Sequence, residues 1–244
     1  KELTAYYQPK VLLSSGDIVG WEALVRWQKP SGTMVYPNDF IPLAEESGLV
    51  APMSMQVLEH SLTVIKKMIN DGYSDISVSV NLSARQMEYG DIVKDIQSAI
   101  DRFNVQPGAL KLEVTETALM KDLDKSLTKL KALRDIGIEI SMDDFGTGFS
   151  SLDYLISLPI SILKIDKSFI QIMSTNERAK AIVESVIGLS QKIGVQVVSE
   201  GIETPQEMEF LRDLKCDYGQ GYYFSRPVPA EIAIEMVRNQ SCEV

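Results

Sequence analysis

The 244-residue chain is poor in the residues on which several common enzyme chemistries depend. It contains a single histidine, His60, and two cysteines, Cys216 and Cys242. His60 falls in a predicted helix, where we expect a structural or surface role. Catalysis by Ser/His/Asp or Cys/His and coordination of zinc each need histidine or cysteine as base or ligand, so these classes are excluded. The spacing of the cysteines matches neither a disulfide framework nor a zinc cluster, which indicates a reducing, cytoplasmic environment.

Long apolar runs and an excess of positive charge are missing too. No apolar run approaches the ~20 residues that cross a bilayer, and no signal peptide is recognisable. The net charge of −10 argues against sequence-independent binding of DNA or RNA, which needs a cationic surface. A nucleotide ligand must therefore be small or held through metal. Because the chain starts at Lys1 without methionine, we expect a domain of a longer protein, with any sensor, regulatory or membrane-anchoring segment outside it.

Hydrophobic periodicity predicts that strands alternate with helices along the chain. Residues 3–13 and 18–28 are predicted strands, and the turn at 14–17 is too short for a crossover helix, so these two strands must be antiparallel. Further strands are expected at 75–82, 109–115, 138–144, 161–166, 195–200 and 218–224. Helices are expected at 40–47, 53–71, 90–104, 122–136, 150–157, 177–193, 204–215 and 230–239, several of them marked by glycine, proline or capping residues.

Eight strands in this alternation favour an α/β fold, a TIM-like (β/α)₈ barrel with an antiparallel first strand. A chain of 244 residues, 45% of them hydrophobic, is long enough for one such barrel, which needs ~250 residues. No linker or low-complexity stretch divides the chain, so residues 1–244 are expected to form a single domain. The alternative is an open doubly wound sheet, which accounts less well for eight strands with one antiparallel.

Several predicted strands carry one polar face. Strands covered on both sides by helices should be almost continuously apolar. Here, however, polar residues alternate with apolar ones at Ser77, Ser79 and Asn81, at Lys111, Glu113 and Thr115, and at Glu139, Ser141 and Asp143. An antiparallel sheet with one wet face would give the same pattern, but the intervening helices disfavour it. We therefore expect the polar faces to point into the barrel, whose carboxyl end holds the active site in barrel enzymes.

The residues expected at that end are mostly acidic. They are Glu22, Asn81, Glu113, Glu116, Asp143, Asp144, Lys164, Asp166, Glu200, Glu203 and Gln220. So many carboxylates at one mouth could not all stay ionised without cations that offset their repulsion. Ligand sets made only of oxygen favour magnesium or manganese over zinc. The residues by themselves thus predict a metal-dependent barrel enzyme.

Ordered short motifs cover nearly the whole chain. They are Tyr-Gln-Pro at 7–9, Gly-Trp-Glu-Ala-Leu-Val-Arg-Trp at 20–27, Phe-Ile-Pro-Leu-Ala-Glu-Glu at 40–46, Asn-Leu-Ser at 81–83, Glu-Val-Thr-Glu at 113–116, Asp-Asp-Phe-Gly-Thr-Gly at 143–148, Leu-Lys-Ile-Asp at 163–166, Glu-Gly-Ile-Glu at 200–203 and Gln-Gly-Tyr at 220–222. At these residues the sequence resembles the EAL-domain family of cyclic di-GMP phosphodiesterases. The resemblance implies hydrolysis of this bacterial second messenger to linear 5′-pGpG with Mg²⁺ or Mn²⁺.

The resemblance also implies a role for individual residues. The ligands of a first metal ion would be Glu22, Asn81, Glu113 and Asp143, and Asp143 would bridge to a second ion held also by Asp144 and Glu200. Two such ions would activate one water and offset charge on the transferred phosphate. Glu200 is in addition a candidate general base. Lys164 would contact the attacking water or a phosphate oxygen, although a salt bridge to Asp166 is the structural alternative.

Substrate contacts are implied for a second group of residues. Arg26 would clamp a phosphate, because guanidinium binds phosphate oxygens in bidentate fashion, unless it is an ordinary surface arginine. The positions that match substrate-contacting or supporting residues of the family are Gln8, Asp166, Glu203 and Gln220. Glu116 resembles a glutamate that braces the loop 145–151, which in the family is linked to dimerisation, so a homodimer is expected.

Two other functions are compatible with parts of the pattern. A receptor that binds cyclic di-GMP without cleaving it would share the fold, but such proteins usually lose metal ligands, the lysine or the loop. A glycoside hydrolase would also use paired carboxylates on a barrel. Its sugar site would favour aromatic platforms, whereas aromatic residues make up only 7% of this chain.

Overall fold

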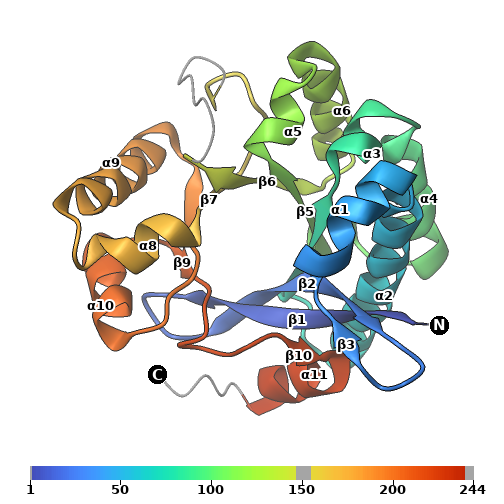
Figure 1. Ribbon diagram of the computed structural model, residues 1–244, viewed down its shortest axis with the longest axis horizontal. Coiled ribbons are helices and arrows are strands. Elements are labelled where there is room, and N and C mark those ends of the chain that lie inside the picture. The colour runs from blue at the N-terminus through green and yellow to red at the C-terminus, as the bar shows by residue number, and fades with distance from the viewer. Residues whose placement is uncertain (1, 147–154, 240–244) are drawn as a thin grey trace.

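Among the residues that the structure describes, eight strands close into a barrel with the helices around its outside (Figure 1). The computed structural model describes residues 2–146 and 155–239. In chain order the barrel strands are β1 (Leu3–Leu12), β2 (Ile18–Gln28), β4 (Ser77–Leu82), β5 (Leu110–Thr115), β6 (Glu139–Phe145), β7 (Ile162–Ile165), β8 (Gln196–Ser199) and β9 (Tyr218–Gly219). Pairing of β1 with β2 closes the ring. The predicted barrel is thus confirmed, and the open doubly wound sheet is wrong.

The first strand runs against its neighbours. β1 is antiparallel to both β2 and β9, whereas every other pair of adjacent barrel strands is parallel. The turn that reverses the chain after β1 uses Gly16, which has a φ of 82° and donates its amide to the Leu12 carbonyl at 2.8 Å. Glycine adopts this conformation without steric cost. The antiparallel first strand expected from the short turn is confirmed.

The described helices lie around the outside of the barrel (Figure 1). The longer ones are α1 (Pro37–Ser47), α2 (Val50–Asn70), α4 (Ile92–Phe103), α6 (Leu123–Asp135), α9 (Glu177–Ile193), α10 (Pro205–Asp213) and α11 (Ala230–Asn239). Shorter elements are the helices α3 (Ala84–Glu88), α5 (Glu116–Met120) and α8 (Lys167–Met173), the 3₁₀ turn η1 (Pro107–Ala109) and the strands β3 (Met34–Val35) and β10 (Val228–Pro229). Within residues 2–146 and 155–239, none of the helices combines the length and the apolar character that crossing a bilayer requires.

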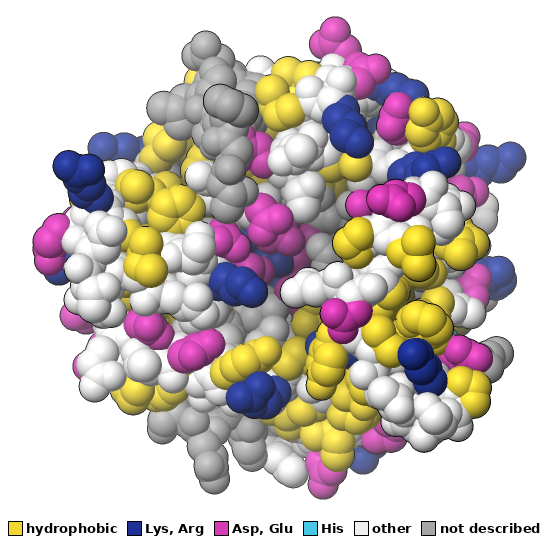
Figure 2. Space-filling view, viewed as in Figure 1, with side chains coloured by type: hydrophobic (Ala, Val, Ile, Leu, Met, Phe, Trp, Pro, Cys, Tyr) yellow, Lys and Arg dark blue, Asp and Glu magenta, His cyan; other side chains and the backbone are white. Residues whose placement is uncertain are grey.

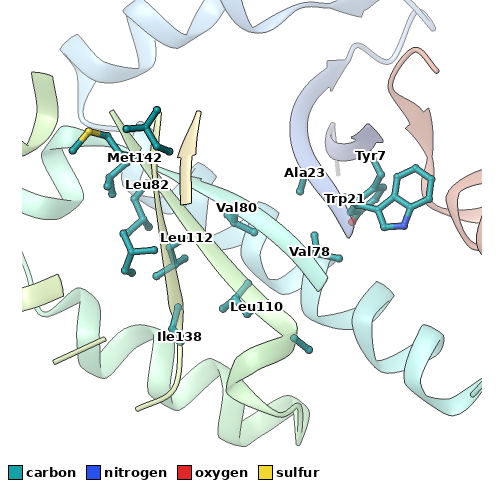
Figure 3. Close-up of a cluster of buried hydrophobic side chains, with 14 of the residues drawn as sticks. Tyr7, Trp21, Ala23, Val78, Val80, Leu82, Leu110, Leu112, Ile138 and Met142 are labelled. Atoms are coloured by element: carbon teal, nitrogen blue, oxygen red, sulfur yellow. The ribbon is translucent and has the colours of Figure 1, made fainter. Parts of the chain in front are cut away.

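The apolar core lies between the barrel strands and the helices. Val78 and Val80 of β4 and Leu110 and Leu112 of β5 are at most 1% exposed. Figure 3 shows these side chains in one cluster with those of neighbouring strands. Because successive side chains of a strand point to opposite faces, the residues between them must point into the barrel.

The polar strand faces are buried inside the barrel. Ser79, Glu113, Ser141, Lys164 and Ser199 are each 1% exposed or less. The alternative was an antiparallel sheet with one solvent-exposed face. It is wrong, because the strands that carry these residues are parallel. The interior of this barrel is therefore polar, and its buried charges need partners.

Three short helices were not expected from the sequence. Each begins where a barrel strand ends and has a capping side chain at that point: Ser83 for α3, Thr115 for α5 and Asp166 for α8. Ser83 and Gln86 form a capping box, a signal that the sequence contained. These helices sit at the barrel mouth because their first residues directly follow the strands.

The last predicted strand, 218–224, is confirmed only for its first two residues. Only Tyr218–Gly219 pairs with a neighbouring strand, and beyond it the amides of Phe224 and Ser225 both donate to the Gly221 carbonyl at 3.2 Å. This turn forms because the chain leaves the barrel after Gly219. Residues 150–154 of the helix expected at 150–157 lie outside the described residues.

Candidate active site

Acidic and amide side chains from the strand ends meet at the barrel mouth. Figure 2 shows acidic side chains gathered in the hollow at the centre of this face. The hollow contains a cavity of about 260 Å³, whose polar lining includes Gln8, Glu22, Asp143, Glu200, Glu203 and Gln220. The structure thus brings together residues that the sequence predicted for the mouth.

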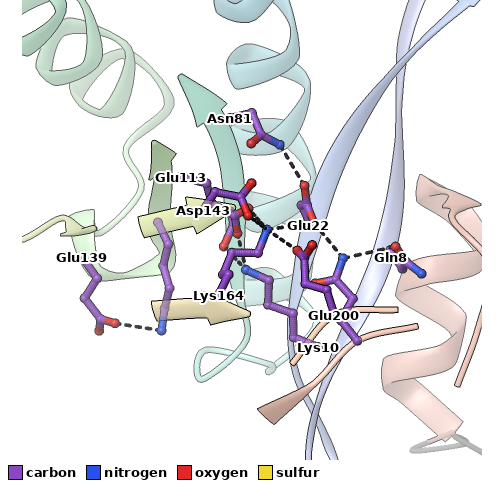
Figure 4. A network of polar contacts seen from close by, with 12 residues as sticks. Gln8, Lys10, Glu22, Asn81, Glu113, Glu139, Asp143, Lys164 and Glu200 are labelled. Carbon is purple, nitrogen blue, oxygen red and sulfur yellow. Dashed lines mark hydrogen bonds and ion pairs between the residues drawn. The ribbon is translucent and has the colours of Figure 1, made fainter. Parts of the chain in front are cut away.

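The ammonium group of Lys164 lies at the centre of this cluster (Figure 4). Its Nζ is 2.6 Å from Glu200 Oε1, 3.2 Å from Asp143 Oδ1 and 3.4 Å from Glu22 Oε2, and it also pairs with Glu113 Oε2. Burial alone would lower the pKa of Lys164, but the four carboxylates raise it well above its usual value. Lys164 is therefore a permanently charged cation in the middle of the acids.

Asp166 has another partner. Its Oδ1 accepts from the amide of Ser168 at 2.9 Å and so caps helix α8. The structure pairs Lys164 with the acids of the mouth, and the alternative of a Lys164–Asp166 salt bridge is wrong.

Glu113 is fully buried and is held by two lysines. Lys10 pairs with its Oε1 and Lys164 with its Oε2. Lys10 also donates to Ser79 Oγ at 2.7 Å. Burial would raise the pKa of Glu113, but the two ammonium groups lower it to about 2, so its carboxylate is ionised.

Sequence reasoning missed Lys10. It lies on β1 two residues after Gln8, and residues two apart on a strand share a face. A lysine on the face of a strand that already points Gln8 into the barrel was the available signal. The antiparallel register places Lys10 opposite Gly20, one layer deeper than Gln8, which is opposite Glu22.

Amide side chains hold both oxygens of Glu22. Asn81 Nδ2 donates to Oε1 at 2.8 Å, and Gln220 Nε2 donates to Oε2 at 2.7 Å. Gln220 Nε2 also contacts Gln8 Oε1 at 3.1 Å, and Gln8 in turn donates to the Ser225 carbonyl at 3.2 Å. Glu22 thereby orients the side chains of both Asn81 and Gln220.

A break in strand regularity sets the positions of Asp143 and Asp144. The register of β6 against β7 shifts between Met142 and Phe145, and Asp144 has a φ of 56°. The amide of Asp144 donates to Asp143 Oδ1 at 3.0 Å. Irregularities of this kind re-aim side chains next to active sites.

The acids on this side of the mouth are difficult to ionise. Burial, together with the charges of Glu113 and Asp144, raises the pKa of Asp143 despite the nearby Lys164. Burial and Asp166 raise the pKa of Asp144. Burial, Asp143 and Glu22 raise the pKa of Glu200 to about 8, although Lys164 opposes them. Lys164 alone therefore does not balance these carboxylates.

The donor set fits a hard divalent cation. Across residues 2–146 and 155–239, no three Asp, Glu, His or Cys side chains as they stand have the arrangement of a metal site, because the acids converge on Lys164 instead. Yet the donors at the mouth are all oxygen atoms, and raised pKa values mark negative charge without a counterion. Oxygen donors with excess negative charge suit Mg²⁺ or Mn²⁺.

Arg26 is not a surface arginine. It is 8% exposed, donates from Nη1 to the Val25 carbonyl at 2.8 Å, and lies 5.6 Å from the ring centroids of both Tyr6 and Tyr36. Burial lowers its pKa. Since it is four residues after Glu22 on β2, it lies on the same strand face, and the alternative of an ordinary surface side chain is wrong.

Glu203 and Glu116 occupy different environments. Glu203 is exposed at the rim, where Gln171 Nε2 lies 3.4 Å from its Oε1. Glu116 is 2% exposed at the first position of α5. Of the loop 145–151 that Glu116 was expected to brace, residues 147–151 lie outside the described part of the chain.

Two loops at the mouth touch through a glycine. The Ile202 amide donates to the Gln220 carbonyl at 3.1 Å, and the Tyr223 amide donates to the Ile202 carbonyl at 3.0 Å. A Cβ atom on Gly221 would lie 2.0 Å from the Ile202 carbonyl oxygen. Only glycine lets these backbones approach so closely, and the contact fixes the backbone of Gln220, whose side chain donates to Glu22.

Comparisons with known proteins agree with this geometry. The family model described as EAL domain matches residues 1–227. The chain is 41% identical over 231 residues to the bifunctional diguanylate cyclase/cyclic di-GMP phosphodiesterase MucR of Pseudomonas aeruginosa, covering 95% of this chain and 34% of MucR. It is 38% identical to the cyclic di-GMP phosphodiesterase NbdA of the same species, covering 97% of this chain and 30% of NbdA. The chain thus spans about a third of the length of these relatives.

A solved structure shares the fold closely. The PaMucR phosphodiesterase in complex with c-di-GMP has a TM-score of 0.92 and 40% sequence identity, over 95% of this chain and 94% of that one.

We predict that Gly221→Ala destabilises the protein by about 2–3 kcal/mol, because the added methyl group overlaps the Ile202 backbone and neither loop can retreat freely. Urea unfolding measures this change. The matched control is Gly108→Ala, since nothing lies within 4 Å of a Cβ atom built there. Equal stability of Gly221→Ala and the wild type would contradict the close approach of the two loops.

Proposed function

Because the chain belongs to the EAL domain family, we propose that it is a metal-dependent phosphodiesterase that hydrolyses cyclic di-GMP to linear 5′-pGpG. The observation that carries the proposal is the mouth itself, in which Lys164 is surrounded by Glu22, Glu113, Asp143 and Glu200. A phosphodiester is negatively charged, so an acidic site can accept it only together with cations. The named activities of MucR and NbdA support the same substrate.

The protein would hold two divalent ions, Mg²⁺ or Mn²⁺. The proposed ligands of the first are Glu22, Asn81, Glu113 and Asp143, and those of the second are Asp143, Asp144 and Glu200. When bound, such ions offset charge on the phosphate and lower the pKa of water. Asn81 and Gln220 fix the carboxylate of Glu22 through both of its oxygens, so this ligand would not have to be ordered on binding.

The residues around the metals would carry out the proton transfers. Water attacks phosphorus and the bond from phosphorus to the 3′ oxygen breaks, which leaves the phosphate on the 5′ carbon of the product. Without cations, burial raises the pKa of Glu200 to about 8, and cations beside it would lower this pKa so that the ionised carboxylate can accept the proton of the attacking water, unless Glu200 serves only as a ligand. The leaving 3′ oxygen takes a proton from solvent. Lys164 Nζ, 2.6 Å from Glu200, stabilises negative charge at the same point.

Residues at the rim would position the substrate. Arg26 is proposed to bind a phosphate oxygen, since its guanidinium lies 5.6 Å from the centroids of two tyrosine rings and a guanidinium matches phosphate oxygens in bidentate fashion. Gln8, Asp166, Glu203 and Gln220 are the other proposed substrate contacts or supports. We also propose that the protein acts in the cytoplasm and that a regulatory domain is fused to this one. Glu116 would brace the loop 145–151, and the protein would form a homodimer.

The direct test is incubation of the purified protein with cyclic di-GMP and either Mg²⁺ or Mn²⁺, followed by chromatography of the nucleotides. We expect conversion to 5′-pGpG, and none with EDTA. Binding of cyclic di-GMP without turnover in either metal would refute the enzyme and favour a receptor that signals through partners.

We expect Glu22→Ala and Asp143→Ala each to lower kcat by at least about 100-fold, because each removes an oxygen donor of the first ion. Steady-state kinetics over a range of Mn²⁺ concentrations measures the loss. Glu184→Ala, an exposed glutamate of α9, is the control and should be fully active. Normal turnover by either site variant would remove that residue from the ligand set.

Lys164→Ala should reduce kcat by about 100-fold or more while changing the Kd of cyclic di-GMP less than tenfold, since its charge acts at the reacting group. Single-turnover rates and equilibrium binding separate the two effects. The control is Lys192→Ala on the exposed face of α9. Full activity of Lys164→Ala would disprove the assigned role.

A further inference from the structure

Two charged side chains lie on the rim of the mouth, apart from the ion pairs formed by Lys10 and Lys164. Lys167 and Glu203 are both exposed, and both line the cavity of about 260 Å³. Lys167 is the first residue of α8, and Glu203 lies in the loop between β8 and α10. The rim therefore presents an ammonium group and a carboxylate group to the same cavity.

The backbone fixes the positions from which these two side chains start. A Cβ atom on Gly201, whose φ is 72°, would lie 2.4 Å from Lys167 Cβ, so the loop after β8 packs directly on the first residue of α8. The amides of Glu203 and Thr204 both donate to Glu207 Oε2, at 2.8 and 2.9 Å. The loop that carries Glu203 is thus tied to α10 on one side and packed against α8 on the other.

Gln171 connects the carboxylate with the helix of the lysine. It lies four residues after Lys167, and therefore on the same face of α8. Its Nε2 is 3.4 Å from Glu203 Oε1, and its side chain lines the same cavity. This contact holds the Glu203 carboxylate next to the helix that carries Lys167. A charged donor and a charged acceptor are thereby placed beside each other.

The cavity also offers a flat apolar surface close to Glu203. Tyr222 lines the cavity and is 50% exposed, and it follows Gly221, which touches the backbone of Ile202. Because Glu203 comes directly after Ile202, the tyrosine ring and the carboxylate belong to loops in contact. Nucleobases stack on aromatic side chains, whichever base they are. A base on this side of the mouth would have a ring for its face and charged groups for its edge.

We propose that Lys167 and Glu203 bind the edge of one guanine base of the substrate and thereby select guanine over adenine. Guanine presents its O6 acceptor beside the N1–H and N2–H₂ donors, which matches an ammonium group beside a carboxylate. Adenine has an amino group in place of O6 and an acceptor at N1, so it would set a donor against Lys167 and an acceptor against Glu203. The inference rests on the proposed function, because it concerns a base of the substrate whose phosphate lies at the acids.

The test is a competition in which cyclic di-GMP and cyclic di-AMP are hydrolysed in one solution with Mn²⁺ and both are followed by chromatography. The two rates give the ratio of the kcat/KM values. The charge of Lys167 also acts on Asp144, so its removal changes the turnover of both substrates, and only the ratio reports base selection. In Lys167→Met, which cannot donate to O6, we expect the preference for cyclic di-GMP to fall about tenfold. Lys167→Arg keeps a donor and should preserve most of the preference.

Glu203→Gln gives a second, independent result. A glutamine amide can accept from the amino group of adenine and donate to its N1, so the preference for cyclic di-GMP should again fall about tenfold, mainly through KM. The matched controls are Lys192→Met and Glu184→Gln at exposed positions of α9, which should keep the wild-type ratio.

The assignment is overturned if either Lys167→Met or Glu203→Gln keeps the wild-type ratio, or if the wild type does not distinguish the two dinucleotides. Both residues are exposed, so we expect the variants to fold, which circular dichroism checks. A wild type that cleaves neither dinucleotide would instead refute the proposed function, and base selection during hydrolysis would fall with it. The two failures are distinguishable, because the first requires an active wild-type protein.

Discussion

The polar interior of this barrel depends on pairing of buried carboxylates with the ammonium groups of Lys10 and Lys164. A carboxylate removed from water is tolerated only with a partner of opposite charge or as a neutral acid. Glu113, fully buried, meets this condition through both lysines at once, and its pKa falls to about 2. Lys164 extends the same compensation to three more acids. The charged mouth can form because these cations lie inside it.

The barrel geometry explains why residues so distant in sequence meet. Parallel strands bring Glu113, Asp143 and Lys164 to one end, since each stands on the inward face near its strand terminus. The reversed β1 contributes differently, because its side chains enter at levels set by the antiparallel register with β2. Gln8 therefore lies at the level of Glu22, and Lys10 lies beneath the acids. A parallel first strand would not give this order of amide above lysine.

Much of this arrangement could be predicted from the sequence. Alternation at Ser79 and Asn81 indicated an inward polar face, and the four-residue turn at 14–17 required an antiparallel first strand. What failed were features that depend on three-dimensional context. Helix α8 begins at the residue after Asp166, where the periodicity showed only the end of a strand. Whether Lys164 pairs with Asp166 or with the acids of other strands depends on closure of the barrel, which local pattern does not encode. The left-handed backbone of Asp144 has no signal in the sequence either.

The negative charge in the mouth is balanced by lysines better around Glu113 than around Asp143, Asp144 and Glu200. Around Glu113 the two lysines lower the pKa by more than burial raises it, so this carboxylate is ionised and held in place. Around Asp143, Asp144 and Glu200 burial and mutual repulsion prevail, and the pKa of each is raised. Uncompensated negative charge therefore lies on the side of the mouth formed by β6 and β8. On the side of Glu113 the two ammonium groups already offset the negative charge of the carboxylate. The two sides of the mouth thus differ in charge balance, because Glu113 pairs with both Lys10 and Lys164, whereas Asp143 and Glu200 pair only with Lys164 among the described residues.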